Sequence, residues 1–505
     1  MRLNIVIGGS AGQGINKISG IVSKIMINQG YFTFNYRDYP SIIRGGHNFN
    51  ILSISDKRVG SYESKIDGII AMDNNTVKVH KKDLKKGGFI IRPDDFLEYG
   101  RNLNVALAGC LIKILGFDKK ILIDEIKKEL NNKKSINAAD KGFEAEKKIF
   151  SLKKLKNKIN IMSGSQAVAI GAVNSEINLY IAYPMTPATG VLHELAAKQI
   201  KNGFMVFQPE NEIAVVNAGL GASFSGARTM VGTSGGGFDL MCEGLSLQGM
   251  SEIPLVVYLA ARPGPGTGVP TYTSQGDLNI ALRGGHGEFP RVVIAPGDPV
   301  EAIEKTNEAF YLSEKFGCLS ILLSDKHLAE SEFSFDGKAK KALKVKVNRK
   351  VPGECIVKAS GYEHDKHGNT TEDASITEKN AIYRLKKYVK IKRVAKRFEM
   401  IKIYGKKNSK NLVIGWGSTK GAILDAIEGL DFKFLQVLYM MPLSEQIKKE
   451  ILKAKNVVLV ENNLTGQLGR LIREKTGIKI EKRILKYDAR PFLSDELRKE
   501  LMKVR

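Results

Sequence analysis

The sequence is poor in cysteine, and its cysteines do not cluster. No CxxC or ferredoxin-type spacing joins the four residues, which are Cys110, Cys242, Cys318 and Cys355. This excludes an iron–sulfur cluster or a structural zinc site held by this chain, because both need neighbouring thiolates. We expect reduced, buried thiols.

Long apolar runs are also missing. A membrane helix needs about 18 consecutive apolar residues, and Ile253–Ala261 is typical of the longest run here. The first residues lead into a strand-like segment without a signal-peptide pattern. We therefore expect a cytoplasmic protein with no membrane association. The hydrophobic fraction of 43% and the charged fraction of 26% exclude a disordered or collagen-like chain.

Acidic residues are few relative to basic ones: 53 Asp and Glu stand against 78 Lys and Arg, a net charge of +25. Such an excess of positive charge can bind nucleic acid, an acidic membrane surface or acidic partners. The basic residues are spread out, with concentrations at Lys338–Lys350 and Lys379–Lys402. No RNA-binding signature, zinc-finger spacing or helix-turn-helix is present. The sequence disfavours nucleic acid as a partner, and a basic nucleic-acid-binding protein stays as an alternative function.

Strand-like and helix-like segments alternate along the chain, which predicts an α/β protein with mostly parallel sheets. We expect three domains, at residues 1–150 with a basic linker to about 160, at 161–345, and at 346–505. The expected buried strands of the second domain are Leu255–Ala260, Arg291–Ala295 and Leu319–Leu323, and the expected strands of the third domain are Leu412–Trp416, Phe434–Leu438 and Asn456–Val460.

A glycine-rich turn, Gly8–Gly14, follows the first strand and precedes a helix. This arrangement can cradle a phosphate on backbone N–H groups, or it can be a tight turn without a ligand. Gly12, Gly14 and the nearby Arg44 are candidate ligand contacts. The spacing G-x-x-G-x-G differs from the dinucleotide fingerprint, so a nicotinamide-dependent dehydrogenase is a second alternative function.

Three segments of the middle domain predict a pocket for a small carboxylate. Tyr183–Pro187 is a proline-stiffened loop after a strand, where open α/β sheets bind ligands. Glu210 and Glu212 open a helix rich in small residues; one of the two can cap that helix while the other faces inward. Arg262–Thr271 is a long polar loop in which an arginine can bind a carboxylate bidentately.

The ordered set of motifs resembles the 2-oxoacid:ferredoxin oxidoreductases, specifically the α subunit with the γ domain fused at its N-terminus. The resemblance spans almost the whole chain. The matching motifs are Gly12-Gln13-Gly14-Ile15, Arg44-Gly45-Gly46, Tyr183–Pro187, Arg262–Thr271 with the following Gln275–Leu278, Gly361–Asp365, Glu461–Asn463 with Gly466-Gln467, and Tyr487–Phe492.

The resemblance implies a fold of a γ domain, a pyrimidine-binding domain and a transketolase C-terminal-like domain. It also implies oxidative decarboxylation of a 2-oxoacid with thiamine diphosphate as cofactor. Glu212 would then contact the aminopyrimidine ring as the catalytic carboxyl, with Glu210 as the second choice. The resemblance further assigns Tyr183 and Pro184 to the cofactor. It assigns the substrate to Arg262, Thr271, Thr186 and Thr267.

The family's diphosphate-binding GDG…N motif is missing here, as is any cluster-binding cysteine pattern. The resemblance implies that Mg²⁺ and the iron–sulfur cluster belong to a β subunit, with no metal on this chain. It also implies ferredoxin as electron acceptor, coenzyme A as cosubstrate, and an αβ or (αβ)₂ assembly. The identity of the 2-oxoacid stays open; 2-oxoglutarate or a broad range is the expectation.

Two positions depart from the family pattern. Gly266 stands where a serine is common in the substrate loop, and Ala489 stands where a glycine is common near the C-terminus. Neither position carries a residue to which the resemblance assigns chemistry.

Overall fold

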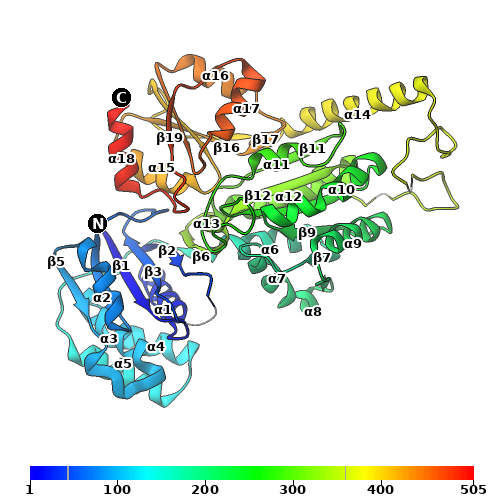
Figure 1. Cartoon of the computed structure of the whole chain (residues 1–505). Helices are drawn as coiled ribbons and strands as arrows, with labels where there is room; N and C mark the ends of the chain where they lie inside the picture. Colours follow the sequence, from blue (N-terminus) through cyan, green and yellow to red (C-terminus); the bar gives the residue numbers. More distant parts are fainter. Residues whose placement is uncertain (43–44, 348, 359, 505) are drawn as a thin grey trace. The chain divides into compact units, whose positions relative to one another are not determined.

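The computed structural model describes residues 1–42, 45–347, 349–358 and 360–504. The chain divides into two compact units. The first comprises Met1–Met162 with Ser331–Gly337 and Phe492–Lys499, and the second comprises Ser163–Glu330 with Lys338–Pro491 and Glu500–Arg505. Three sheets with helices against them make up the fold (Figure 1). The predicted α/β class with mostly parallel sheets is confirmed.

The first unit is built on a mixed seven-stranded sheet of order β5-β4-β1-β3-β2-β13-β6. Strand β1 pairs parallel with β4 but antiparallel with β3, which also pairs antiparallel with β2. The strands are β1 (Arg2–Gly9), β2 (Phe32–Asp38), β3 (Asn48–Ser55), β4 (Ile66–Ala71), β5 (Leu84–Ile91), β6 (Asn160–Ser163) and β13 (Glu332–Phe335). The helices are α1 (Ile15–Asn28), α2 (Asn74–His80), α3 (Leu103–Leu115), α4 (Lys119–Glu129) and α5 (Lys133–Ala145), with short 3₁₀ turns at Lys81–Asp83 and Asp94–Asn102.

Helix α5 belongs to the core of this unit. Gly109 of α3 and Gly142 of α5 let the two helices approach closely, since a Cβ on Gly142 would lie 1.9 Å from the carbonyl oxygen of Ala106. Phe143 is buried against the same core. Between α5 and β6 the chain has no regular structure.

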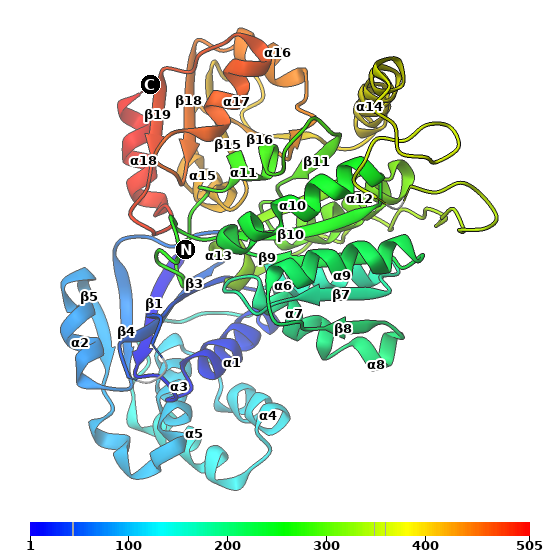
Figure 2. The same ribbon diagram turned by 45° about the vertical axis from the view of Figure 1, so that its right-hand side comes forward.

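The second unit contains a seven-stranded sheet of order β17-β11-β12-β10-β9-β7-β8 and a five-stranded sheet of order β14-β16-β15-β18-β19. Figure 2 shows the helices lying against the seven-stranded sheet. Its strands are β7 (Leu179–Ala182), β8 (Met205–Phe207), β9 (Thr229–Thr233), β10 (Leu255–Ala261), β11 (Arg291–Ile294), β12 (Leu319–Asp325) and β17 (Tyr439–Met441). The five-stranded sheet consists of β14 (Ile401–Gly405), β15 (Asn411–Trp416), β16 (Lys433–Val437), β18 (Asn456–Glu461) and β19 (Lys482–Leu485).

The helices of the second unit cover the two sheets. Those of the middle part are α6 (Gly164–Asn174), α7 (Thr189–Ala196), α8 (Gln199–Asn202), α9 (Glu212–Phe224), α10 (Gly235–Ser251), α11 (Leu278–Arg283), α12 (Pro299–Phe316) and α13 (Lys326–Glu330). The later ones are α14 (Ala374–Ala395), α15 (Thr419–Ile427), α16 (Gln446–Lys453), α17 (Gln467–Thr476) and α18 (Ser494–Lys503).

The expected buried strands of the second unit are confirmed within a residue or two at their ends. They are mostly apolar runs between turn signals, as expected for strands buried on both faces. One strand crosses the expected domain division, because β17 from the C-terminal part pairs antiparallel with β11 of the middle sheet.

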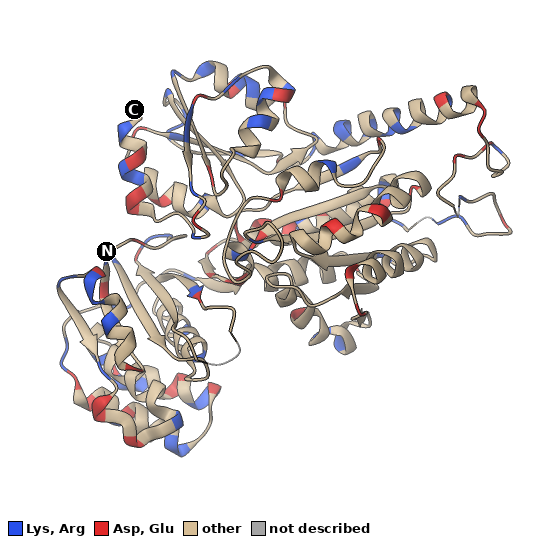
Figure 3. Ribbon diagram, viewed as in Figure 1, with Lys and Arg blue, Asp and Glu red and all other residues tan. Residues whose placement is uncertain are grey.

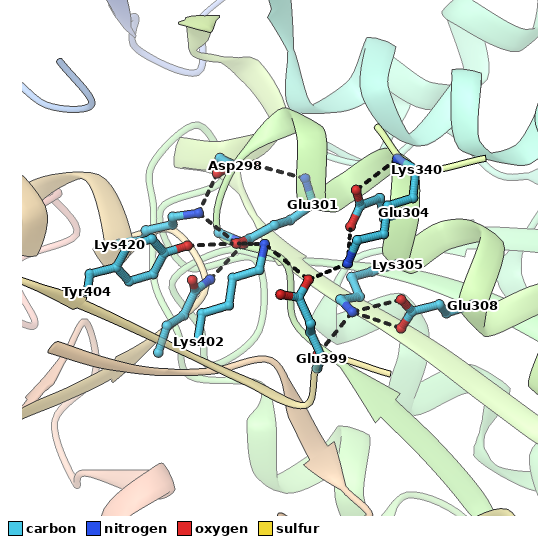
Figure 4. Close-up of polar contacts among 12 residues, drawn as sticks. Asp298, Glu301, Glu304, Lys305, Glu308, Lys340, Glu399, Lys402, Tyr404 and Lys420 are labelled. Carbon is cyan, nitrogen blue, oxygen red and sulfur yellow. Dashed lines mark hydrogen bonds and ion pairs between the residues drawn. The ribbon is translucent and has the colours of Figure 1, made fainter. Parts of the chain in front are cut away.

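A buried charge cluster joins α12 to the five-stranded sheet (Figure 4). Glu301 on α12 is 1% exposed, and its Oε1 lies 2.6 Å from Lys420 Nζ and 3.1 Å from Lys402 Nζ. Its Oε2 accepts from Gln436 Nε2 at 2.7 Å and from the backbone N–H of Gly297 at 2.8 Å. Every lone-pair direction of this buried carboxylate therefore faces a donor, which is the condition for keeping a charge in the interior.

Figure 3 shows Lys and Arg residues on every part of the chain. Along α14, Glu378 is the one carboxylate beside seven Lys and Arg residues, which are Lys379, Arg384, Lys386, Lys387, Lys390, Lys392 and Arg393. Among the described residues, no helix is long and apolar enough to cross a bilayer.

The cysteines carry no disulfide in the described part of the chain. Cys110 and Cys318 are buried, and burial raises the pKa of each thiol to about 12. The expectation of burial is wrong for Cys355, which is exposed on the irregular segment before α14, and holds only partly for Cys242.

Candidate active site

Glu212 is the first residue of α9 and points into the protein. It is 3% exposed, whereas Glu210, two residues earlier in the loop, is exposed. The helix is capped by Asn211, whose Oδ1 accepts from the backbone N–H of Ala214 at 2.9 Å. The expectation that one of the two glutamates caps the helix is therefore wrong: the amide side chain does this, and the Glu212 carboxylate is left for another role.

The Glu212 carboxylate packs against the start of α10. A Cβ on Gly237 would lie 2.5 Å from Glu212 Oε1 and 2.2 Å from Thr233 Oγ1, so only a glycine fits at this position. The Oε1 atom is fully covered and has no hydrogen-bond partner among the described residues. A buried carboxylate oxygen without a donor is costly, which marks this position as one that a bound group completes.

Arg262 follows the last residue of β10 and reaches across to the proline-stiffened loop. Its Nη1 donates to the carbonyl oxygen of Thr186 at 3.0 Å, while its covered Nε has no partner in the described structure. Burial lowers the pKa of Arg262, and the charges of Asp277 and Glu212 act in the opposite direction. The structure thus brings together three of the predicted segments, with two carboxylates acting on one guanidinium.

Asp277 is the second carboxylate of this cluster. Its Oδ2 is covered, has no hydrogen-bond partner among the described residues, and would lie 2.6 Å from a Cβ on Gly235. Burial, reinforced by the charge of Asp239 and opposed by that of Arg262, raises the pKa of Asp277 to about 7. The N-terminal turn of α10 therefore has one carboxylate against Gly235 and another against Gly237.

The C-terminal sequence motifs hold this cluster in place. Gln275 Oε1 accepts from the backbone N–H of Asn462 at 2.9 Å, and its Nε2 donates to the Trp416 carbonyl oxygen at 2.8 Å. Gln467 Nε2 donates to the carbonyl oxygen of Gly276 at 2.6 Å. Residues directly before Asp277 are thus fixed by the last residue of β15, the residue after β18 and the first residue of α17.

The remaining predicted residues of the middle part differ in exposure. Thr271 is buried and Thr186 is half-buried, whereas Thr267, Tyr183 and Pro184 are exposed. The loop that carries Thr267 folds tightly on itself, because the backbone N–H of Val269 donates to the Pro263 carbonyl oxygen at 3.1 Å.

The glycine loop of the first unit is closed by its own side chains. Gln13 Oε1 accepts from the backbone N–H of Ser10 at 2.7 Å, which occupies one of the N–H groups that a phosphate would use. Gly14 has a positive φ of 81° and lies against Asn104, while Gly12 borders open space. Arg44 lies outside the described residues.

Sequence reasoning assigned no role to Asp277 or to Ser234, whose covered Oγ also has no partner in the described part of the chain. The available signal was the run Gln275–Leu278 after the substrate loop, with its single acidic residue next to a helix start. No group of three or more His, Cys, Asp or Glu side chains converges to hold a metal among the residues described.

Two family models match the chain. One, described as pyruvate ferredoxin/flavodoxin oxidoreductase, matches residues 4–96. The other, described as pyruvate flavodoxin/ferredoxin oxidoreductase, thiamine diphosphate-binding, matches residues 170–390, which include Glu212, Arg262 and Asp277. The second model therefore assigns thiamine diphosphate binding to the part of the chain that carries the carboxylate cluster.

Relatives match over the full length. The 2-oxoacid:ferredoxin oxidoreductase subunit alpha of Sulfolobus sp is 31% identical, with 100% of this chain and 97% of the relative covered. The 2-oxoglutarate synthase subunit KorA of Archaeoglobus fulgidus is 30% identical over 61% of this chain and 89% of the relative. A solved 2-oxoglutarate:ferredoxin oxidoreductase from Magnetococcus marinus superposes with a TM-score of 0.90 at 25% identity, covering 99% of both chains. The chain belongs to the 2-oxoacid:ferredoxin oxidoreductases, as an enzyme subunit of the alpha type, and the predicted family is confirmed.

Proposed function

We propose that this chain supplies the pyrimidine side of a thiamine diphosphate site that a β subunit completes. The complex carries out the oxidative decarboxylation of a 2-oxoacid to an acyl-CoA and CO₂, with reduction of ferredoxin. The observation that carries the proposal is the buried Glu212 Oε1, which lies at the start of α9 without a partner in the described structure.

The residues around Glu212 fit an aminopyrimidine ring. Such a ring offers a nitrogen that a carboxyl group can bond, and Glu212 has one covered oxygen to do so. Gly236 lies between Gly235 and Gly237, the two glycines against which the carboxylates pack. The atom nearest to the position of a Cβ on Gly236 is 3.9 Å away, so the backbone leaves room beside the Glu212 carboxyl. When bound, thiamine diphosphate supplies the nucleophilic carbon and the electron sink of the reaction.

The residues of this chain orient the cofactor and the substrate and hold a proton. Glu212 holds the proton shared with the pyrimidine nitrogen, and its burial keeps water from competing for that bond. Arg262, with the Thr186 carbonyl oxygen fixing its guanidinium, binds the substrate carboxylate, and Thr271, Thr186 and Thr267 offer hydroxyl groups beside it. Tyr183, Pro184 and Glu210 line the approach to the cofactor.

The β subunit, in this proposal, carries Mg²⁺ and the iron–sulfur cluster, and the assembly is αβ or (αβ)₂. The absence from the sequence of clustered cysteines supports this division of labour. Residues 1–150, 161–345 and 346–505 form the γ, pyrimidine-binding and C-terminal domains, and Gly12, Gly14 and Arg44 of the γ domain contact a phosphate-bearing ligand such as coenzyme A.

We expect 2-oxoglutarate or a broad range of 2-oxoacids as substrate, since the Magnetococcus marinus enzyme is described with 2-oxoglutarate, coenzyme A and succinyl-CoA bound. The test is a panel of 2-oxoacids given to the co-purified αβ complex with coenzyme A and ferredoxin. Formation of the matching acyl-CoA in step with ferredoxin reduction supports the proposal and names the substrate. A complex loaded with cofactor and cluster that converts none of the acids contradicts it.

A further inference from the structure

Asp277 stands at the N-cap position of α11 but does not cap the helix. An aspartate there normally accepts a backbone N–H of the first turn, which stabilises a helix by about 1 kcal/mol. No side-chain capping bond is formed by Asp277, and its Oδ2 is covered without a partner among the described residues. The side chain instead turns toward the start of α10, where it lies against Gly235.

Two charged side chains act on this carboxyl, and a third acts on the cation beside it. Arg262, after β10, is attracted to it, and Asp239 on α10 repels it. Glu212 on α9 acts on the same guanidinium, less strongly than Asp277 does. The positive end of the α10 dipole adds a fixed favourable potential for a negative charge. Arg262 is therefore shared by two carboxylates before any substrate carboxylate arrives.

A substrate carboxylate at Arg262 would be a third negative charge in a covered site. Like charges at short range in low dielectric repel by several kcal/mol, and one of them is neutralised instead. Asp277 is the group best placed to do so, because neither its Oδ2 nor Glu212 Oε1 has a donor among the described residues and the proposed function gives only Glu212 a partner, the pyrimidine ring. Burial already raises the pKa of Asp277 to about 7, so little further repulsion is needed.

We propose that Asp277 is a positioning residue that controls how tightly Arg262 holds the substrate carboxylate, and that Asp277 takes up one proton when that carboxylate binds. The proton comes from solvent and forms an O–H bond on the Asp277 carboxyl, so that net charge in the site is conserved. This inference rests on the proposed role of Arg262 and extends it.

The direction of the pH dependence follows from this exchange. Binding is favoured by protonated Asp277, so affinity for a carboxylate is highest below pH 7 and falls as pH rises through the pKa of the free site. With that pKa near 7, the dissociation constant rises about fivefold between pH 7 and pH 8. Asp277→Asn, which is neutral at every pH, removes the dependence and keeps the shape of the side chain.

The experiment is calorimetric titration of oxalate, an unreactive carboxylate, into the αβ complex loaded with thiamine diphosphate and Mg²⁺. The binding heats measured at pH 7 in phosphate and in Tris differ in proportion to the number of protons taken up, because the two buffers have different ionisation enthalpies. We expect an uptake of about 0.5 proton per oxalate in the wild type and none in Asp277→Asn. Asp239→Asn is the control: it removes a nearby exposed charge that raises the pKa of Asp277, so more of the free Asp277 is ionised and the uptake stays at or above the wild-type value.

Equal uptake in Asp277→Asn and wild type overturns the proposal, as does oxalate binding by the wild type without uptake or no oxalate binding at all. Oxalate binding by the wild type without proton uptake overturns the proposal even if Asp277→Asn does not fold. The readout is separate from turnover: a complex that takes up the proton on binding oxalate but reduces no ferredoxin contradicts the proposed function and not this inference.

Discussion

The Glu212 carboxylate lies directly against the backbone of Gly237, so that a Cβ on Gly237 would fall 2.5 Å from Glu212 Oε1. This contact fixes the carboxyl without donating to it. The glycine acts as a spacer at the start of α10, and the free oxygen stays available for a ligand.

Gly237→Ala should therefore displace Glu212 while leaving the helix intact. Alanine favours a helix by about 1 kcal/mol over glycine, but its methyl group would overlap both Glu212 and Thr233. We expect the affinity of the αβ complex for thiamine diphosphate to fall at least about tenfold, which corresponds to about 1.4 kcal/mol, as measured by fluorescence titration. Gly236→Ala is the control, since the nearest atom to its Cβ would be 3.9 Å away; unchanged affinity in both variants contradicts this account of the site.

Glu212→Gln should nearly abolish turnover, because an amide cannot share a proton with the pyrimidine ring as a carboxyl can. We expect a fall in kcat of about 10²–10⁴-fold with the αβ complex still assembled, measured by ferredoxin reduction and size-exclusion chromatography. The exposed Glu210 provides the comparison, and Glu210→Gln should keep most of its activity. The reverse pattern would transfer the catalytic role to Glu210.

Ala489 has a left-handed backbone, with a φ of 65°, at a position where the family commonly has glycine. A Cβ in this conformation costs about 1–2 kcal/mol. Replacing Ala489 by glycine relieves this strain, but part of the stabilisation is lost because glycine increases the conformational entropy of the unfolded chain. We expect Ala489→Gly to stabilise the protein by up to about 1 kcal/mol in urea unfolding. Ala489→Val, which is β-branched, should destabilise it; a stabilising valine would mean that this strain is absent.

Lys420→Met should destabilise the second unit strongly, because it leaves Glu301, which is 1% exposed, short of its nearest cation. Breaking such a buried pair costs about 3–5 kcal/mol. Lys406→Met, at an exposed ion pair with Asp431, is the control and should leave the unfolding midpoint unchanged.

The ion pair between Glu301 and Lys420 also predicts that the free energy of unfolding depends on pH. Burial by itself raises the pKa of Glu301, but the charges of Lys420 and Lys402 outweigh it and hold that pKa below its ordinary value. The stabilisation is complete above the pKa of an unfolded glutamate and is lost as pH falls through the lowered value. The difference between wild type and Lys420→Met should therefore narrow below about pH 4.5; a difference that stays constant down to pH 3 would contradict the role of this charge pair.

Local patterns in the sequence predict the strands and the position of Glu212 well. Leu255–Ala261 is an unbroken apolar run between turn signals, and Glu212 begins a helix of small residues, so both can be predicted from a few neighbouring residues. The contact of Asp277 with Gly235 cannot be predicted in this way, because Gly235 lies 42 positions earlier in the chain. Nothing in the sequence next to Asp277 indicates that it leaves its own helix uncapped. The pairing of β13 with β2 and of β17 with β11 joins segments that lie still farther apart in the sequence.

The most direct test of the central claim is ferredoxin reduction measured with this chain alone, with the β subunit alone, and with both together. The account predicts reduction that depends on a 2-oxoacid, coenzyme A and thiamine diphosphate, and that occurs only when both chains are present. Reduction of ferredoxin by this chain alone, or no reduction by the assembled and cluster-loaded complex, would contradict the claim that it forms half of a shared thiamine diphosphate site.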